Sequence, residues 1–355
     1  MTCPSPIALP ICNNAKWAFT TRRVKRSDVR GLSEDFDGAK AGDLLLCEIA
    51  EVGHHKRIQL AERRVSESYP GDLVVLCVGD RYAPDQFLAS AVIDGPVIDL
   101  VAGGGVAGRV DAAHELMEEP TKLRPLALLT GAQGEVLNVA DYALPALPAN
   151  GQISVIGVIG ASMNSGKTTA AASLAHGLKR AGYATAAVKA TGTGAFGDFN
   201  SYEDGGVPAL DFTDAGMATT FRVPLERIEH GFDTLVATAA VGGAEVVVVE
   251  IADGVFQQET RAILEASRIR DRLDGILFAA PDALSAHGGV MVLERVNLSP
   301  FAISGVVSCS PLAAAEAAEV TGLPILSREA LWSPETIRLH VVPFMRQGRQ
   351  ESYAA

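Results

Sequence analysis

The sequence has few cysteines, a deficit of basic residues and no long apolar run. Five of its 355 residues are cysteines and none form a Cys-x-x-Cys pair, so we expect neither disulfide staples nor a structural zinc site. The formal net charge of −12 argues against broad binding to nucleic acid or to anionic membranes. No apolar run reaches the ~20 residues of a membrane-spanning helix, and the N-terminus shows no secretion signal. We therefore expect a cytoplasmic protein that binds neither nucleic acid nor a membrane.

One segment near the middle of the chain carries the strongest functional signal. The apolar residues 152–159 lead into a Gly- and Ser-rich turn, then into Gly166-Lys167-Thr168 and an alanine-rich helical pattern. This order is typical of a P-loop, in which backbone N–H groups and a helix N-terminus converge on a polyphosphate. Lys167 is expected to reach the β- and γ-phosphates, and the Thr168 hydroxyl to hold Mg²⁺. Ala161 replaces the first glycine of the strict pattern, a mild change because the position mainly needs a small residue. The residues predicted to bind nucleotide here are Asn164, Ser165, Gly166, Lys167, Thr168 and Thr169.

A proline-containing linker near residues 143–151 predicts two domains. Before it, short apolar or alternating runs separated by Gly-Asp turns predict a smaller β-rich, barrel-like domain over residues 1–145, with one helix at 111–118. After it, strands alternate with helices over residues 151–340, and residues 341–355 are left as a tail. The fold class is α/β, with a mostly parallel sheet covered by helices on both faces.

A long loop is expected after the strand that follows the P-loop helix. Residues 189–222 show no clear periodicity and are rich in Gly and Asp, and loops of this length are usually functional. The loop begins with a cation, Lys189, and continues with hydroxyls and carboxylates that suit an anionic substrate and a metal. We predict catalytic roles for Lys189 and Thr193. We also predict Asp198 as a metal ligand, although several carboxylates of this loop compete for that role.

An acidic residue lies near the end of the strand predicted at residues 245–251. Glu250 is flanked by apolar residues, where a carboxylate is costly unless a cation pairs with it. Beside a P-loop, such a residue commonly completes the Mg²⁺ site. The predicted metal ligands are therefore Thr168, Asp198 and Glu250.

Three motifs together resemble dethiobiotin synthetase and its relatives. They are Gly166–Thr169, Lys189–Gly194 and Val248–Gly254. The resemblance implies that Lys189 contacts both the substrate and the γ-phosphate, and that the protein is a homodimer.

Two further segments extend the comparison. Pro281 and Ser308 stand where the synthetase family has its base-binding end, so the resemblance implies that they lie beside the nucleobase. The stretch 205–216 also resembles a broader, poorly characterised family that carries a P-loop domain behind a separate N-terminal domain.

These features predict an ATP- and Mg²⁺-dependent enzyme that acts on a small, anionic molecule. In the leading hypothesis, a ligase activates a carboxylate or carbamate by γ-phosphoryl transfer, for amide or ring formation. Two alternatives use the same parts. One is a small-molecule kinase, and the other is a P-loop NTPase switch or metallochaperone-like protein that acts on a partner protein.

Overall fold

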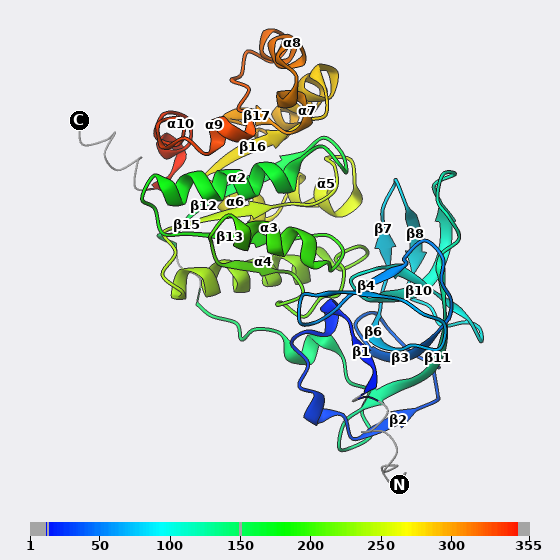
Figure 1. Cartoon of the computed structure of the whole chain (residues 1–355). Helices are drawn as coiled ribbons and strands as arrows, with labels where there is room; N and C mark the ends of the chain where they lie inside the picture. Colours follow the sequence, from blue (N-terminus) through cyan, green and yellow to red (C-terminus); the bar gives the residue numbers. More distant parts are fainter. Residues whose placement is uncertain (1–11, 13, 149–150, 347–355) are drawn as a thin grey trace. The chain divides into compact units, whose positions relative to one another are not determined.

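A computed structural model describes residue 12 and residues 14–148 and 151–346. The chain forms two compact units (Figure 1). The β-rich unit contains the residues up to Leu144 together with Thr193–Phe196 and Phe212–Arg222. The P-loop unit contains the remaining residues. The β-rich unit thus includes two short segments whose sequence positions lie inside the P-loop half of the chain.

A nine-stranded sheet dominates the β-rich unit. Its strands are β1 (Lys16–Trp17), β2 (Gly31–Ser33), β3 (Leu44–Glu51), β6 (Leu73–Val78), β7 (Arg81–Tyr82), β8 (Phe87–Ser90), β9 (Ile98–Ala102), β10 (Val106–Ala113) and β11 (Thr121–Thr130), and β4 (Arg57–Gln59) pairs separately with β5 (Val65–Glu67). The strands β6, β3, β11, β9 and β10 pair in this order, and β10 pairs again with β6 to close a ring. The β-rich character predicted for the first domain is confirmed. The helix predicted at 111–118 is wrong, because β10 continues to Ala113 in pairing with β8.

The continuous apolar run of β3 reflects burial on both faces of the strand. Successive side chains of a strand point to opposite faces. Leu45, Cys47 and Ile49 belong to one buried cluster, whereas Leu44 and Leu46 belong to another. The strand therefore separates two layers of core and lacks the polar alternation of a half-exposed strand.

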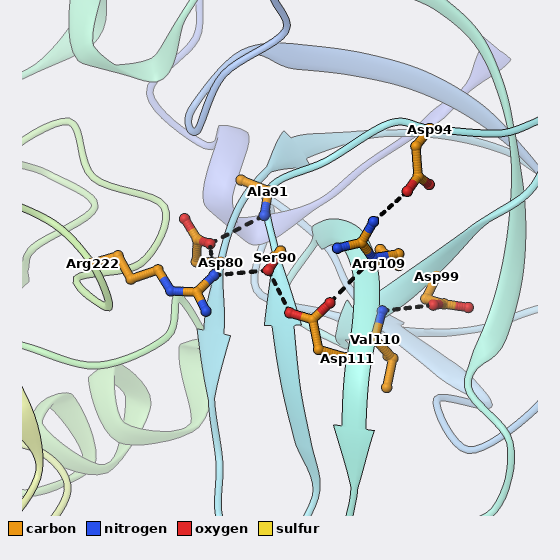
Figure 2. Close-up of polar contacts among 9 residues, drawn as sticks. All are labelled: Asp80, Ser90, Ala91, Asp94, Asp99, Arg109, Val110, Asp111 and Arg222. Carbon is orange, nitrogen blue, oxygen red and sulfur yellow. Dashed lines mark hydrogen bonds and ion pairs between the residues drawn. The ribbon is translucent and has the colours of Figure 1, made fainter.

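Polar contacts hold the segment Phe212–Arg222 within the β-rich unit. The Arg222 guanidinium donates to an Asp80 carboxylate oxygen and to Ser90 Oγ, each at 2.8 Å (Figure 2). At the other end of the segment, the Asp214 carboxylate accepts from the Arg22 guanidinium at 2.6 Å. Figure 2 also shows the Ser90 hydroxyl bound to Asp111, which extends the network to β10.

The shorter segment Thr193–Phe196 is also packed tightly within this unit. The Phe196 amide donates to Gln59 Oε1 at 2.6 Å. A Cβ added to Gly104 would lie 1.8 Å from the Gly194 carbonyl oxygen, so the two backbones approach at a distance that only glycine permits.

The P-loop unit is built on a six-stranded sheet in which every pairing is parallel. The strand order is β14-β13-β15-β12-β16-β17. These strands are β12 (Ser154–Gly160), β13 (Thr185–Lys189), β14 (Ala209–Asp211), β15 (Val246–Glu250), β16 (Gly275–Ala279) and β17 (Ala302–Ser304). The helices are α2 (Lys167–Arg180), α3 (Phe196–Asp204), α4 (Leu225–Val241), α5 (Gln258–Glu265), α6 (Arg268–Arg272), α7 (Ala283–Arg295), α8 (Pro311–Thr321), α9 (Arg328–Leu331) and α10 (Pro334–His340). Nowhere in the described part is a helix long and apolar enough to cross a membrane.

Helices cover both faces of this sheet, as predicted. Figure 1 shows α2 and α4 on opposite sides of it. Val246 and Val248 of β15 pack in the same buried cluster as α2. Val247 and Val249 point to the other face and are also fully buried. Burial on both faces explains why β15 is an uninterrupted run of four valines before Glu250.

The packed part of the chain extends beyond residue 340, where the sequence boundaries place a tail. Val341 and Met345 are buried in the cluster that contains α2. Arg346 Nε donates to the Asp274 carboxylate at 3.0 Å. Residues 341–346 therefore belong to the core of the P-loop unit.

Replacement of Gly177 tests the packing of α2 against the end of α9. A Cβ at Gly177 would lie 1.8 Å from the Leu331 carbonyl oxygen, so Gly177→Ala must push the two segments apart. We expect a loss of about 1–3 kcal/mol in the free energy of unfolding. Gly288→Ala in α7 is the matched control, because a Cβ there meets nothing within 4 Å. That variant should keep or slightly raise the stability. Equal thermal stability of the two variants would contradict this packing.

Candidate nucleotide-binding site

The turn between β12 and α2 contains two residues with left-handed backbone conformation and ends at Gly166, the N-cap of α2. Asn164 and Gly166 have φ angles of 62° and 94°, in the left-handed region that glycine and asparagine tolerate best. A Cβ on Gly166 would lie 2.9 Å from Gly305 Cα, so the close approach to the turn after β17 also requires glycine.

The strict P-loop pattern has a glycine at the position of Ala161. In this chain the glycine, Gly160, comes one position earlier. A Cβ on Gly160 would lie 2.4 Å from Ser165 Oγ and 2.7 Å from Lys167 Cγ. Gly160 therefore makes room for the lysine stem. Ala161 does not lie in the left-handed region, so its methyl group causes no backbone strain. The chain therefore departs from the strict pattern in the position of the glycine that leaves space for the Lys167 side chain.

The first turn of α2 is free of a side-chain cap. Its N-cap residue, Gly166, makes no capping hydrogen bond, whereas α5 to α10 each begin with a capping side chain. The first amides of any helix have no carbonyl partner within the helix. At α2 these N–H groups and the positive end of the helix dipole remain available to an anion.

Lys167 is folded over this loop and is only 6% exposed. Its Nζ donates to the Ser162 carbonyl oxygen at 2.8 Å. Burial lowers the pKa of Lys167, and the nearby carboxylates of Glu250 and Asp253 oppose that shift. The amine is thus held over the loop whose amides would surround a phosphate.

Glu250 connects the P-loop to the neighbouring strand. It is 2% exposed, and its Oε1 accepts from the Thr168 hydroxyl at 3.1 Å. Its Oε2 accepts from the Tyr202 hydroxyl of α3. Burial, followed by the charge of Glu250, raises the pKa of Tyr202 well above its usual value, so the phenol stays protonated and donates.

The donor set around Thr168 and Glu250 suits magnesium bound together with a nucleotide. Within the described residues, no group of three or more His, Cys, Asp or Glu side chains is arranged to hold a metal on its own. Mg²⁺ in P-loop proteins instead combines phosphate oxygens and waters with one or two protein ligands. Thr168 and Glu250 can supply those protein ligands.

Lys189 lies beside Glu250 at the carboxyl edge of the sheet. The two residues are register partners on β13 and β15, and Asp211 is the register partner of Lys189 on β14. The Lys189 ammonium forms an ion pair with the Asp198 carboxylate of α3. The structure therefore places Asp198, predicted as a metal ligand, against the lysine.

Asp253 occupies the turn after β15. Its neighbour Gly254 approaches the P-loop so closely that a Cβ would lie 2.4 Å from the Ala161 carbonyl oxygen. Burial raises the pKa of Asp253 to about 6, and the positive charges of Lys167 and Lys189 limit this rise.

Two of the remaining predicted residues, Pro281 and Ser308, lie in the turns after β16 and β17. Ser308 lies in the 3₁₀ turn after β17, and the amide of Val306 in that turn donates to the Ser165 carbonyl oxygen at 3.1 Å. Pro281 follows β16, and the turns after β16 and β17 are joined by a bond from the Val307 amide to the Ala280 carbonyl oxygen. Both turns thus border the P-loop within the same unit.

Thr193 belongs to the β-rich unit. There it forms an isolated bridge with Thr219. The catalytic role of Thr193 stays a prediction.

Sequence reasoning missed Tyr202, because it treated residues 189–222 as a loop without regular structure. The structure forms α3 in this interval. Phe196, Phe199 and Tyr202 recur at a spacing of three, which is a helical stripe that could have indicated this helix. The bond to Glu250 itself is a long-range contact that no local pattern reveals.

The parallel sheet, the turn after β12 and the uncapped helix that follows it have the arrangement of a P-loop fold. No protein-family profile and no curated protein matches the chain. The signal recognition particle 54 kDa protein from Aeropyrum pernix K1, solved in complex with GDP, is 21% identical over 60% of this chain and 50% of its own, with a TM-score of 0.36. The signal recognition particle receptor FtsY from Elizabethkingia anophelis is 18% identical over 48% and 56%, with a TM-score of 0.35.

These matches span only about half the length of each solved chain. Neither likeness assigns a family, a nucleotide or an activity to this protein. They also lend no support to the more specific resemblance to dethiobiotin synthetase, which stays a prediction.

The raised pKa of Asp253 predicts a pH dependence of stability. The ordinary pKa is 3.8 and the folded value is about 6, so between these values the folded chain retains a proton that the unfolded chain releases. Stability should therefore fall as the pH rises through this window, by at most about 3 kcal/mol for this group.

Asp253→Asn should remove this contribution. We expect the variant to gain stability relative to the wild type as the pH rises from about 4 to about 7. Urea denaturation of nucleotide-free protein in EDTA measures the difference, with the exposed Asp37→Asn as control. A stability difference between Asp253→Asn and the wild type that does not change with pH would disprove the assignment.

Proposed function

We propose that this protein is a Mg²⁺-dependent P-loop enzyme that transfers the γ-phosphoryl group of ATP to a small anionic substrate. The observation that carries the proposal is the row of charges at the carboxyl edge of the sheet. Lys189 on β13 stands in direct register between Asp211 on β14 and Glu250 on β15, and β15 is adjacent to the P-loop strand β12. A cation placed there serves a second anion next to the triphosphate.

The loop residues supply the binding of the triphosphate. The amides of the first α2 turn and the Lys167 ammonium stabilise the negative charge on the β- and γ-phosphates. Thr168 and Glu250 would hold Mg²⁺, which neutralises charge on the phosphate oxygens when it is bound. The chain needs no covalent nucleophile for this chemistry, because positioning and charge stabilisation supply most of the catalysis.

Lys189 is proposed to orient the acceptor. Its ammonium is paired with Asp198, and a substrate carboxylate or carbamate can replace that carboxylate as its partner. An oxygen of the substrate then attacks the γ-phosphorus, the bond between this phosphorus and the β–γ bridging oxygen breaks, and ADP leaves. The product is an acyl phosphate. In the ligase reaction an amine attacks its carbonyl carbon and releases phosphate, whereas in a kinase the phosphorylated compound is the final product.

One observation favours a nucleotide-operated switch as a second candidate. The chain passes from Gly192 of the P-loop unit directly into Thr193 of the β-rich unit, and the same transition follows Asp211 at the end of β14. Lys189 and Asp211, which flank these transitions, belong to the charged row. A change of nucleotide state at this edge would therefore act on chain segments that are built into the β-rich unit.

Phosphate release in the presence and absence of small carboxylates and amines distinguishes these functions. The ligase predicts release that depends on both an acid and an amine, and a kinase predicts a stable phosphorylated product. Steady hydrolysis without any metabolite dependence would favour the switch. A parallel assay with GTP tests the choice of nucleotide.

Removal of the Lys189 charge should separate binding from turnover. Lys189→Ala is expected to bind Mg·ATP within about twofold of the wild type, and to lower substrate-dependent turnover by about 100-fold, because the acceptor loses its counter-charge. Nucleotide affinity is measured by calorimetry and turnover by phosphate release. Lys179→Ala, at the exposed end of α2, is the matched control. A large loss of nucleotide affinity in Lys189→Ala alone would show that the lysine serves the nucleotide and not the acceptor.

A further inference from the structure

A cavity of about 400 Å³ lies on the outer side of α2 in the P-loop unit. Thr169, Ser173 and His176 of α2 form its floor, and they recur at the spacing of one helix face. Asp204 at the end of α3 and Arg328 at the start of α9 border it as well. Its volume falls within the range of small-molecule sites.

The cavity is bordered by two opposite charges that do not neutralise each other. The described part of the chain gives the Asp204 carboxylate no hydrogen bond and no ion pair, and it gives the Arg328 guanidinium no ion pair. Arg328 and Asp204 therefore line one cavity at more than the 4.0 Å that defines an ion pair. A ligand with one charge of each sign can satisfy both groups at once.

The residues around these charges are held in place by packing and by backbone contacts. The Arg328 guanidinium carbon lies 4.7 Å from the centroid of the Trp332 ring, which restrains the long arginine side chain. The Trp332 ring meets the His176 ring edge to face at 6.2 Å. The Trp332 carbonyl oxygen accepts from Arg180 at 2.9 Å, which fixes the end of α9 on α2.

His176 has a defined hydrogen-bonding role in the floor. Its Nδ1 lies 2.9 Å from the Gly205 carbonyl oxygen, and because a carbonyl only accepts, Nδ1 carries the proton. In the neutral ring the other nitrogen, Nε2, is therefore an acceptor. The floor thus offers hydroxyl groups and an imidazole acceptor between the two charges.

We propose that this cavity binds a small zwitterion that carries one carboxylate and one ammonium group, such as a free amino acid. The Arg328 guanidinium binds the carboxylate, for which its planar fork of donors is suited. The Asp204 carboxylate binds the ammonium, and Trp332 provides an apolar surface for the side chain of the ligand. The two charged groups, Arg328 and Asp204, are not among the residues predicted to bind the nucleotide, although Thr169 of the floor is.

Calorimetric titration of the full-length, nucleotide-free protein with the common L-amino acids tests the proposal. Each amino acid that binds is compared with the amine and the carboxylate that lack one of its two charged groups. We expect saturable binding of at least one amino acid, and binding of both analogues that is at least about 10-fold weaker. Tryptophan fluorescence gives a second readout, to which Trp332 in the cavity and Trp17 in the β-rich unit both contribute.

Charge-removing variants locate the binding. Asp204→Asn and Arg328→Gln should each weaken the affinity by at least about 10-fold. Both residues are exposed, so the variants should fold normally. Glu203→Gln and Arg338→Gln are the matched controls, because these exposed residues do not line the cavity. Lys167→Ala should bind the amino acid normally, which separates this site from the proposed nucleotide site.

Three results would overturn the proposal. The first is that no amino acid binds at concentrations up to about 10 mM. The second is that Asp204→Asn and Arg328→Gln both bind as tightly as the wild type. The third is that a carboxylate without an amine binds as tightly as the amino acid while Asp204→Asn has no effect, which would make the cavity a simple anion site.

Discussion

A buried carboxylate at the end of β15 organises the P-loop unit. Burial of an unpaired carboxylate costs several kcal/mol, so Glu250 must be satisfied where it stands. The Thr168 and Tyr202 hydroxyls donate to its two oxygens, and they come from α2 and α3. One side chain thus fixes the first turn of the P-loop helix relative to α3. Since α3 also carries Asp198, the same helix positions the lysine that is proposed to meet the substrate.

Side chains of alternating charge line the carboxyl edge of the sheet beside Glu250. Asp211, Lys189 and Glu250 are consecutive register partners on three parallel strands, and the carboxyl ends of parallel strands are where α/β proteins bind ligands. Lys189 lies between these two carboxylates in the register, and its ammonium is paired with Asp198. The uncapped amides of α2, in the connection that follows β12, add positive potential at the same edge of the sheet. The unit therefore combines an uncapped helix N-terminus with a lysine that is paired with Asp198.

The sequence was most informative where function depends on consecutive residues. The P-loop was predictable because its turn, lysine and helix start lie within a few positions, and Glu250 stood out as an acid inside an apolar strand. The contacts of Gly160 with Ser165 and Lys167 show why the spacing departs from the strict pattern, which only the packed structure reveals. By contrast, α3 was missed because few of its residues are apolar, and its Tyr202 is buried by segments distant in sequence. The inclusion of Thr193–Phe196 and Phe212–Arg222 in the β-rich unit rests on bonds such as that between Arg222 and Asp80, which join residues far apart in the chain.

The most direct test of this account is calorimetric titration of the folded protein with ATP and with GTP, each with and without Mg²⁺. The account predicts that at least one nucleotide binds with one-to-one stoichiometry. Its affinity should fall by at least about 100-fold in Lys167→Ala, which lacks the cation over the loop, and more modestly when Mg²⁺ is omitted. Absence of binding by both nucleotides, or equal affinity in the wild type and Lys167→Ala, would contradict the assignment of this turn as a phosphate site.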